Sequence, residues 1–281
     1  MSAHSLSNPH TVVIRPPKGL APLDLKLLWQ FRDLLRAFAE RDIRLRYRQT
    51  VLGAAWVILQ PLMGAGIFSI VFGLIAKLPS DGVPYFLITY SGFLGWTLFQ
   101  GIVARVSPSL VANSALIRKV FFPRLLVPLG VVPSVVLDFL VSLVLMFVLM
   151  LVFRVSPSWG LLLVPAALLI LITMGLGIAL VACALAVKYR DVQHIVPFGV
   201  QLLMYASPVG YSVSVIPAKA QTLYFLLNPV AVPLDTIRWA FVGVGELRAE
   251  WLAYSAAVAV VAFAVGLMVF HSNEREFADV I

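Results

Sequence analysis

Charged residues are scarce in this chain of 281 residues. Asp, Glu, Lys and Arg together make up 12% of the sequence, whereas apolar residues make up 61%. An average soluble domain has about 25% charged and about 45–50% apolar residues. A water-soluble fold could not bury so much apolar material, so the composition excludes an ordinary soluble domain and indicates an integral membrane protein.

Residue types that ligate metals or react are also few. The single cysteine, Cys183, lies inside an apolar run, which leaves no disulfide framework and no thiolate metal cluster. The four histidines are scattered at predicted loops and helix ends, without the spacing of a zinc site. They are His4, His10, His194 and His271. We therefore expect no metal and no cofactor on this chain.

The motifs of nucleotide chemistry are missing. The sequence contains neither a G-x-x-x-x-G-K-[ST] loop nor a dinucleotide-binding fingerprint. Any ATP and its magnesium ion must then be bound by another chain. There is also no G-x-S-x-G motif and no close pair of acids in an apolar segment, so an intramembrane enzyme is unsupported. Residues 1–22 lack the apolar core of a signal peptide, and we expect the first span to act as the targeting signal.

Six apolar segments meet or approach the length of a membrane span, which is about 20 residues for about 30 Å of hydrocarbon. They are 53–76, 83–104, 125–153, 161–187, 195–213 and 251–270. Prolines inside several of them are tolerated where neighbouring helices satisfy the freed carbonyl groups. The predicted fold class is therefore an all-α integral membrane protein with six transmembrane helices.

The distribution of basic residues sets the orientation. With the N-terminus inside, sixteen of the 21 Lys and Arg residues lie on the cytoplasmic side, as the positive-inside rule requires. Charges close to a span weigh most, and five arginines lie just before the first one: Arg36, Arg41, Arg44, Arg46 and Arg48. Both termini are predicted to be cytoplasmic. The net charge of +8 then reflects topology, and no nucleic-acid partner is expected.

Residues 23–48 are predicted to form an amphipathic helix at the membrane interface. Its apolar residues fall on one helical face, and charged residues occupy the rest. The apolar face consists of Leu27, Phe31, Leu34, Leu35 and Phe38. Such a helix can lie on the lipid surface, or it can also dock a partner, and the sequence alone leaves both interpretations open.

Two connecting segments are too apolar to be plain linkers. The segment 105–124 interleaves basic residues with apolar ones. The segment between the fifth and sixth spans is broken by Pro217, Pro229 and Pro233 and contains two short apolar pieces, 222–227 and 234–242. Neither piece can span a membrane, so we predict a re-entrant hairpin that dips into the outer leaflet.

Asp138 is the one acid well inside a predicted span. An unpaired carboxylate in a membrane costs several kcal/mol, so it has either a functional role or a partner, such as an arginine at a helix end or a hydroxyl group. Aromatic residues in the spans have two interpretations as well. Tyr90, Phe93 and Trp96 belong either to an interfacial aromatic belt or to a path that stacks on sugar rings.

Several motifs resemble one known family. They are RDIRLRYRQTVLG at 41–53, then Trp56 and QPL at 60–62, NSALIRKVFFPR at 113–124, KYRD at 188–191 and NP at 228–229. In order and spacing they are similar to the ATP-binding-cassette permeases of polysaccharide and polyol phosphate export. The resemblance runs from about Leu23 to the C-terminus. It divides the chain into a flexible cytoplasmic N-terminus at 1–22, the amphipathic helix at 23–48 and an exporter transmembrane domain at 49–281.

The resemblance implies a homodimer mounted on two cytoplasmic ATPase subunits in a bacterial inner membrane. It places a coupling helix at about Ser109 to Pro123 and a second ATPase contact after the fourth span. The residues that it assigns to coupling are Leu116, Ile117, Arg118, Lys119, Phe121, Lys188, Tyr189, Arg190 and Asp191. The chain itself would perform no covalent reaction, so it is not an enzyme.

The same resemblance implies a lipid-linked polysaccharide as substrate, with O-antigen favoured. Its diphosphate would enter from the inner leaflet near Arg44, Arg46 and Arg48, although the positive-inside rule alone can explain these arginines. The residues expected at the channel or its gate are Tyr90, Phe93, Trp96, Tyr205, Tyr224, Asn228 and Trp239. Capsule or teichoic-acid export, a membrane-embedded transferase and a multidrug exporter are the alternatives.

Overall fold

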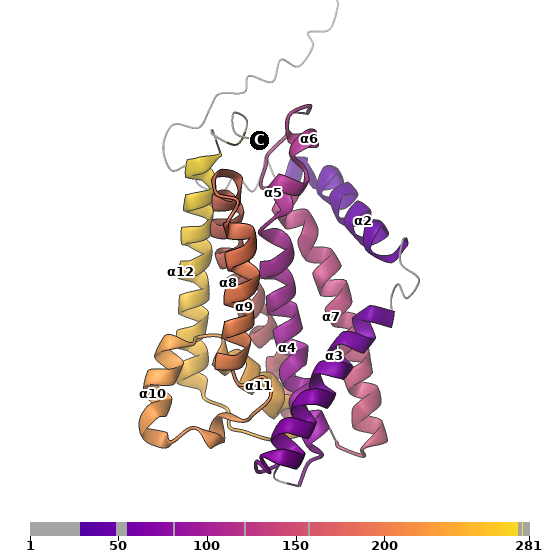
Figure 1. Cartoon of the computed structure of the whole chain (residues 1–281), viewed down its shortest axis with the longest axis vertical. Helices are drawn as coiled ribbons and strands as arrows, with labels where there is room; N and C mark the ends of the chain where they lie inside the picture. Colours follow the sequence, from indigo (N-terminus) through magenta and orange to yellow (C-terminus); the bar gives the residue numbers. More distant parts are fainter. Residues whose placement is uncertain are drawn as a thin grey trace, which may run out of the picture.

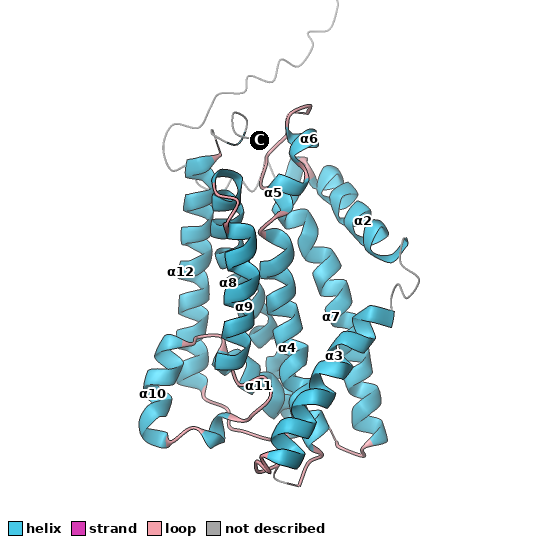
Figure 2. Cartoon of the chain, viewed as in Figure 1, coloured by secondary structure: helices cyan, strands magenta, loops and turns pink. Residues whose placement is uncertain are grey.

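The computed structural model describes residues 29–48, 55–80, 82–120, 122–156, 158–274 and 277. These residues form helices and loops, with no strand among them (Figure 2). The predicted N-terminal segment 1–22, the start of the amphipathic helix at 23–28, residues 49–54 and Phe121 lie outside the described residues.

Five helical segments are long and apolar enough to cross a membrane. They are α3 with η1 (Ala55–Ile75), α4 (Tyr85–Val106), α7 (Leu126–Val152), η2 with α8 (Trp159–Lys188) and α12 (Ala249–Asn273). Each coincides within a few residues with a predicted span. The last part of the first segment, Ser69–Ile75, is a π-helix. The chain is thus an all-helical protein built to cross a membrane several times.

The fifth predicted span is shorter in the structure than in the sequence prediction. The apolar run 195–213 overlaps α9 (Val192–Ala206), a helix of 15 residues, only as far as residue 206. At about 1.5 Å per residue, this helix is about 22 Å long, which is less than the hydrocarbon thickness. Ser207 adopts an extended backbone and Pro208 follows it, so the helix ends there although the sequence stays uncharged up to residue 213. The six-span arrangement therefore stays a prediction.

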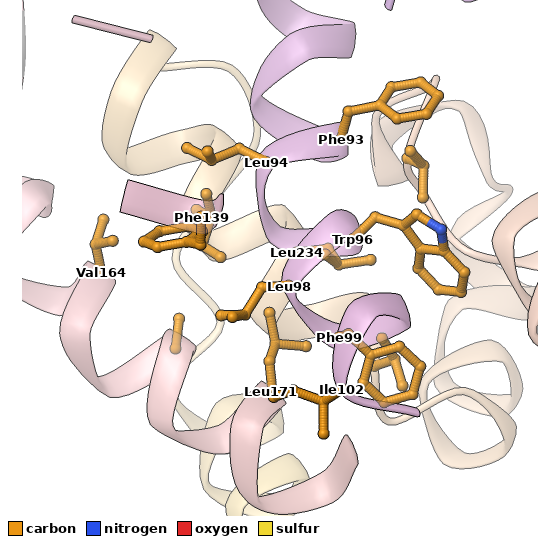
Figure 3. Close-up of a cluster of buried hydrophobic side chains, with 14 of the residues drawn as sticks. Phe93, Leu94, Trp96, Leu98, Phe99, Ile102, Phe139, Val164, Leu171 and Leu234 are labelled. Carbon is orange, nitrogen blue, oxygen red and sulfur yellow. The ribbon is translucent and has the colours of Figure 1, made fainter. Parts of the chain in front are cut away.

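The core lies around α4, the most deeply buried of the five long segments. Figure 3 shows side chains from three neighbouring helices gathered around it. Phe139 comes from α7, Leu171 from α8, and Leu234 from α11 (Ala231–Val242). A helix with apolar residues on every side is covered either by other helices or by lipid, and α4 is covered mainly by other helices.

Helices α8 and α12 make the most extensive contact of any helix pair among the described residues. Gly177 and Gly266 lie at their closest approach. A Cβ atom on Gly177 would lie 2.6 Å from the backbone nitrogen of Phe263, and one on Gly266 would lie 3.0 Å from the Cα atom of Gly177. Small residues let helix backbones meet in this way, and close van der Waals packing holds membrane helices together.

The helix bundle has two distinct ends (Figure 1). The α2 end carries α2 (Arg32–Arg48), α5 (Ser109–Ala112), α6 (Ser114–Ile117) and the last residues of α12. The α10 end carries α10 (Ala218–Leu227) and α11. These two short helices contain the predicted apolar pieces 222–227 and 234–242, so the prediction that no single helix crosses there is confirmed.

The apolar face of α2 packs against the protein. Phe38 is buried, and its ring lies 5.5 Å from the ring of Phe122. Gly130 on α7 has no side chain, which leaves room for the Cβ atom of Phe38. Half-buried Phe31, Leu34 and Leu35 join the same cluster. A helix is therefore present within the predicted segment, at Arg32–Arg48, and it docks this face onto its own helix bundle. Its location at the membrane interface stays a prediction.

Candidate functional site

Polar side chains from three helices meet in one group at the α2 end, which we name the α2 network. Its members come from α2, α4 and α7, and four of the six are charged. They are Asp42, Arg46, Tyr47, Arg105, Ser134 and Asp138. Asp138, near the middle of α7, is the centre of the network.

Three donors converge on the Asp138 carboxylate. The Nη2 atom of Arg46 lies 2.9 Å from Oδ2, and Arg105 of α4 forms an ion pair with the same oxygen. The Tyr47 hydroxyl donates to Oδ1 at 2.5 Å. Ser134, one turn before Asp138, donates to the carboxylate of Asp42. The interpretation that Asp138 has arginine and hydroxyl partners is therefore confirmed.

The α2 network is electrically balanced. Its two carboxylates, from Asp42 and Asp138, face the guanidinium groups of Arg46 and Arg105. Partial burial and the hydrogen bond to Asp138 raise the pKa of Tyr47 to about 12. The phenol therefore keeps its proton at neutral pH and stays a donor. Ion pairs of this kind are costly to break because removing one partner leaves the other charge uncompensated.

The three arginines predicted to meet a lipid diphosphate have different surroundings. Arg44 is exposed and pairs with Glu40 of the preceding turn at 2.8 Å. Arg46 is already engaged by Asp138. Arg48 is the last residue of α2, and its side chain lies outside the described residues. Of the two described guanidinium groups, only that of Arg44 is exposed and held by a surface ion pair, which a ligand can displace at little cost.

The predicted coupling segment has a buried side and an exposed side. Ile117 and Phe122 are buried against the chain's own core, whereas Arg118, Lys119 and Val120 are exposed. Leu116 is half-buried. Arg41 of α2 donates to the Asn113 side chain, between α5 and α6. The segment is thus bound to α2 on its buried side, and its basic residues Arg118 and Lys119 lie on its exposed side.

The second predicted ATPase contact lies at the same end of the bundle (Figure 1). Lys188 ends α8, and Tyr189, Arg190 and Asp191 connect it to α9. All four are exposed. The hydroxyl of Ser109 on α5 lies 3.6 Å from the sulfur of Cys183 on α8. The helices that lead into the two predicted ATPase contacts are therefore in contact with each other.

Three of the predicted channel residues lie in the interior of the bundle. Tyr90 is fully buried on α4. On the same helix Trp96 is fully buried and Phe93 is nearly so (Figure 3). The Tyr90 hydroxyl donates to the carbonyl of Ser142 at 2.9 Å, and the Trp96 ring nitrogen donates to the side-chain oxygen of Gln100 at 2.6 Å. Within one chain these side chains serve as core, because their polar atoms are satisfied inside the protein.

The other predicted channel residues lie toward the α10 end. Tyr205 is exposed on α9, and its ring is stacked 6.4 Å from that of Phe68. Tyr224 and Asn228 both donate to the carbonyl of Ala206, the last residue of α9. Trp239 packs edge-on against another tryptophan, at 5.3 Å. Their assignment to a channel stays a prediction.

Sequence reasoning missed a second charged group, at the α10 end. Arg238 of α11 is fully buried and pairs with Asp235 at 3.0 Å. Arg248 approaches the other oxygen of the same carboxylate at 3.1 Å. The available signal was an acid and an arginine three residues apart in an apolar helix, a spacing that places them on one face. We name Asp235, Arg238 and Arg248 the Arg238 clamp.

The described structure thus defines a class: a multi-pass helical membrane protein with exposed basic loops at one end. Residues 33–242 match the family described as ABC-2 type transporter. The chain belongs to this family, whose members are transport permeases.

Named relatives cover almost the whole chain. It is 31% identical over 255 residues to the O-antigen export system permease protein RfbA of Myxococcus xanthus, spanning 90% of this chain and 97% of that protein. It is 28% identical over 253 residues to RfbA of Klebsiella pneumoniae, with 89% and 95% covered. The polysialic acid transport protein KpsM of Escherichia coli is 25% identical over 245 residues, with 84% and 91% covered.

Proposed function

We propose that this chain is the permease subunit of an exporter that moves a lipid-linked polysaccharide across a bacterial inner membrane. The observation that carries the proposal is the near full-length similarity to permeases named for O-antigen export. A polysialic acid transport protein is similar over almost the same length. O-antigen is therefore the favoured substrate within the polysaccharide class.

Two copies of the chain and two separate ATPase subunits make up the proposed transporter. The chain has no phosphate-binding loop of its own, so ATP and magnesium belong to the ATPase subunits. The exposed basic residues of the coupling segment and the exposed 188–191 loop lie at one end of the bundle. This placement supports docking of the ATPase there, with ATP-driven closure pushing the segment and opening a path between the two copies.

The proposed topology has six crossings and both termini in the cytoplasm. Its fifth crossing consists of α9 together with the non-helical residues 207–212 that follow it. Sixteen of the 21 basic residues then lie inside, in accord with the positive-inside rule. In this topology α2 lies at the inner interface, while α10 and α11 form a re-entrant hairpin in the outer leaflet. Their lengths of 10 and 12 residues support the hairpin, because neither can span the membrane.

Co-purification tests the proposed function directly. The chain is expressed with the ATPase encoded beside it, purified in detergent and reconstituted into proteoliposomes. We expect a stable complex that hydrolyses ATP and moves a lipid-linked polysaccharide to the other leaflet. A chain that binds no candidate ATPase, or a complex that moves no such lipid, would contradict the proposal.

Charge reversal at Arg118 tests the coupling segment. Arg118→Glu should uncouple ATP hydrolysis from export, because an exposed arginine facing an acidic partner surface would become repulsive. We expect transport per ATP hydrolysed to fall by roughly tenfold, about 1.4 kcal/mol of coupling. Arg154→Glu is the matched control, since Arg154 is also exposed but follows α7 at its far end. Equal coupling in the two variants would reject this segment as the ATPase contact.

The proposed diphosphate path near α2 is tested at Arg44. Arg44→Gln should lower export several-fold, because a planar guanidinium binds phosphate oxygens in pairs. Its ion pair with Glu40 is exposed and contributes about 0.3–0.5 kcal/mol, so stability should hardly change. The readout is the dependence of export rate on lipid-linked substrate concentration. Unchanged export in this variant would remove Arg44 from the path.

A further inference from the structure

The guanidinium group of Arg238 binds three backbone carbonyl groups as well as Asp235. Its Nε atom donates to the carbonyl of Ile88 at 3.4 Å, and Nη2 donates to that of Val209 at 3.2 Å. The Nη2 atom also donates to the carbonyl of Pro208, while Nη1 binds Asp235. One side chain therefore joins α4, the turn directly after α9, and α11.

The same turn is held by the α10–α11 hairpin at further points. The carbonyl of Ala206 accepts hydrogen bonds from Tyr224 at 2.9 Å and from the Asn228 amide at 3.2 Å. The Asn228 amide also donates to the hydroxyl of Ser207 at 2.9 Å. The end of α9 is thus bound through its backbone, by donors that come mostly from one hairpin.

There is little free space at this junction. A Cβ atom on Gly92 of α4 would collide with the carbonyl of Val209 and would lie 2.9 Å from Nη2 of Arg238. The absence of a side chain at Gly92 lets the turn approach α4 closely enough for Arg238 to reach both. A displacement of the turn would leave the buried guanidinium with unmade hydrogen bonds, and that is costly in a low-dielectric setting.

We propose that Arg238 is a positioning residue that locks the end of α9 to the α10–α11 hairpin, so that both move as one gate. The inference rests on the proposed export function, in which the predicted channel residues Tyr205 of α9 and Tyr224 of α10 lie along the path. The charged donor suits this role because hydrogen bonds from a guanidinium group are stronger than those from neutral donors. Arg248 has a different role: its guanidinium group pairs with the carboxylates of Asp235 and Glu246 and lies 5.4 Å from the ring of Phe225.

The difference between the two arginines supplies a matched control. Arg238→Gln and Arg248→Gln each remove one positive charge beside Asp235 and leave the other in place. Only the first also releases the carbonyls of Ile88, Pro208 and Val209. Arg238→Lys keeps the charge, but a single ammonium group cannot reproduce the forked contacts of the guanidinium.

The experiment measures leakage through the permease–ATPase complex in proteoliposomes loaded with carboxyfluorescein, without ATP. We expect Arg238→Gln and Arg238→Lys to release the dye about tenfold faster than the unaltered complex, because a weakened lock raises the population of the open state. Arg248→Gln should stay close to the unaltered rate. Thermal unfolding of each complex is recorded in parallel, and the Lys variant covers the case in which Arg238→Gln does not fold.

Two outcomes would overturn the inference. If folded Arg238 variants retain the dye, closure of the path does not depend on the hydrogen bonds of Arg238. Equal leakage in Arg238→Gln and Arg248→Gln, with rescue by Arg238→Lys, would show that charge balance at Asp235 matters and the backbone contacts do not. An unaltered complex that seals the dye but moves no polysaccharide would contradict only the proposed export function, so the two failures are distinguishable.

Discussion

Asp138→Asn is expected to abolish ATP-driven export and to lower the stability of the protein. The substitution leaves Arg46 and Arg105 facing a neutral amide in a largely buried position, where only 12% of the Asp138 side chain is exposed. Removing one partner of a buried ion pair costs about 3–5 kcal/mol. Because the two arginines are partly exposed, we expect a loss near 3 kcal/mol. Thermal unfolding in detergent and export in proteoliposomes are the measurements.

Glu40→Gln is the control for this prediction. It also removes one carboxylate that pairs with an arginine of α2, but that pair is exposed. Such a pair contributes about 0.3–0.5 kcal/mol, so the variant should unfold and export like the unaltered chain. An Asp138→Asn variant that matches it in both measurements would show that the α2 network is dispensable.

A triple variant separates the structural role of the network from its functional role. Asp138→Leu combined with Arg46→Met and Arg105→Met removes Asp138 and both of its arginine partners at once, and leaves Asp42 with the hydroxyl of Ser134. Replacing a buried ion group by apolar residues is often neutral for stability or even favourable. A stable triple variant that fails to export would show that the α2 network is needed for transport itself. A stable triple variant that exports would show that the network only holds α2 against the bundle.

Gly177→Leu should destabilise the protein more than any substitution on an exposed helix face. The new side chain would meet the backbone of Ala262 and Phe263 on α12. Overpacking of this kind costs about 1–3 kcal/mol, and more where neither backbone can move. The readout is the unfolding temperature of the purified chain, together with its expression level in the membrane.

Gly199→Ala is the matched control for the close helix contact. Gly199 lies within α9 and has no atom within 4 Å of its Cβ position. Alanine has the higher helix propensity, by about 1 kcal/mol, so this variant should be neutral or slightly more stable. Equal stability of Gly177→Leu and Gly199→Ala would contradict the view that α8 and α12 are held together by backbone contact.

Hydropathy predicted most of the fold because each long apolar segment is a self-contained signal. Five of the six predicted segments coincide with the five helices that are long enough to span. The sixth prediction was longer than α9 because hydropathy does not record where the backbone turns. Residues 207–213 carry no charge, yet they leave the helix, and the carbonyls of Pro208 and Val209 are bound by Arg238.

The charged groups show where sequence reasoning stops. Asp138 was found because a lone acid in an apolar run demands a partner, and the choice of an arginine was correct. That Arg46 and Arg105 both supply that partner depends on how α2 and α4 lie against α7. Arg238 was missed for a similar reason. It counted only as one of the basic residues on the outer side, since burial of an arginine is a property of the packed helices.

The glycine contact between α8 and α12 has a mechanical consequence. With no side chain between the two backbones at Gly177 and Gly266, neither helix can slide or rotate there by a change of rotamer. The two helices therefore form one rigid unit along the bundle. In the proposed transporter, a change in the width of the path would then involve the opposite side of the chain, where α3 and η1 expose Met63, Ile67 and Leu74.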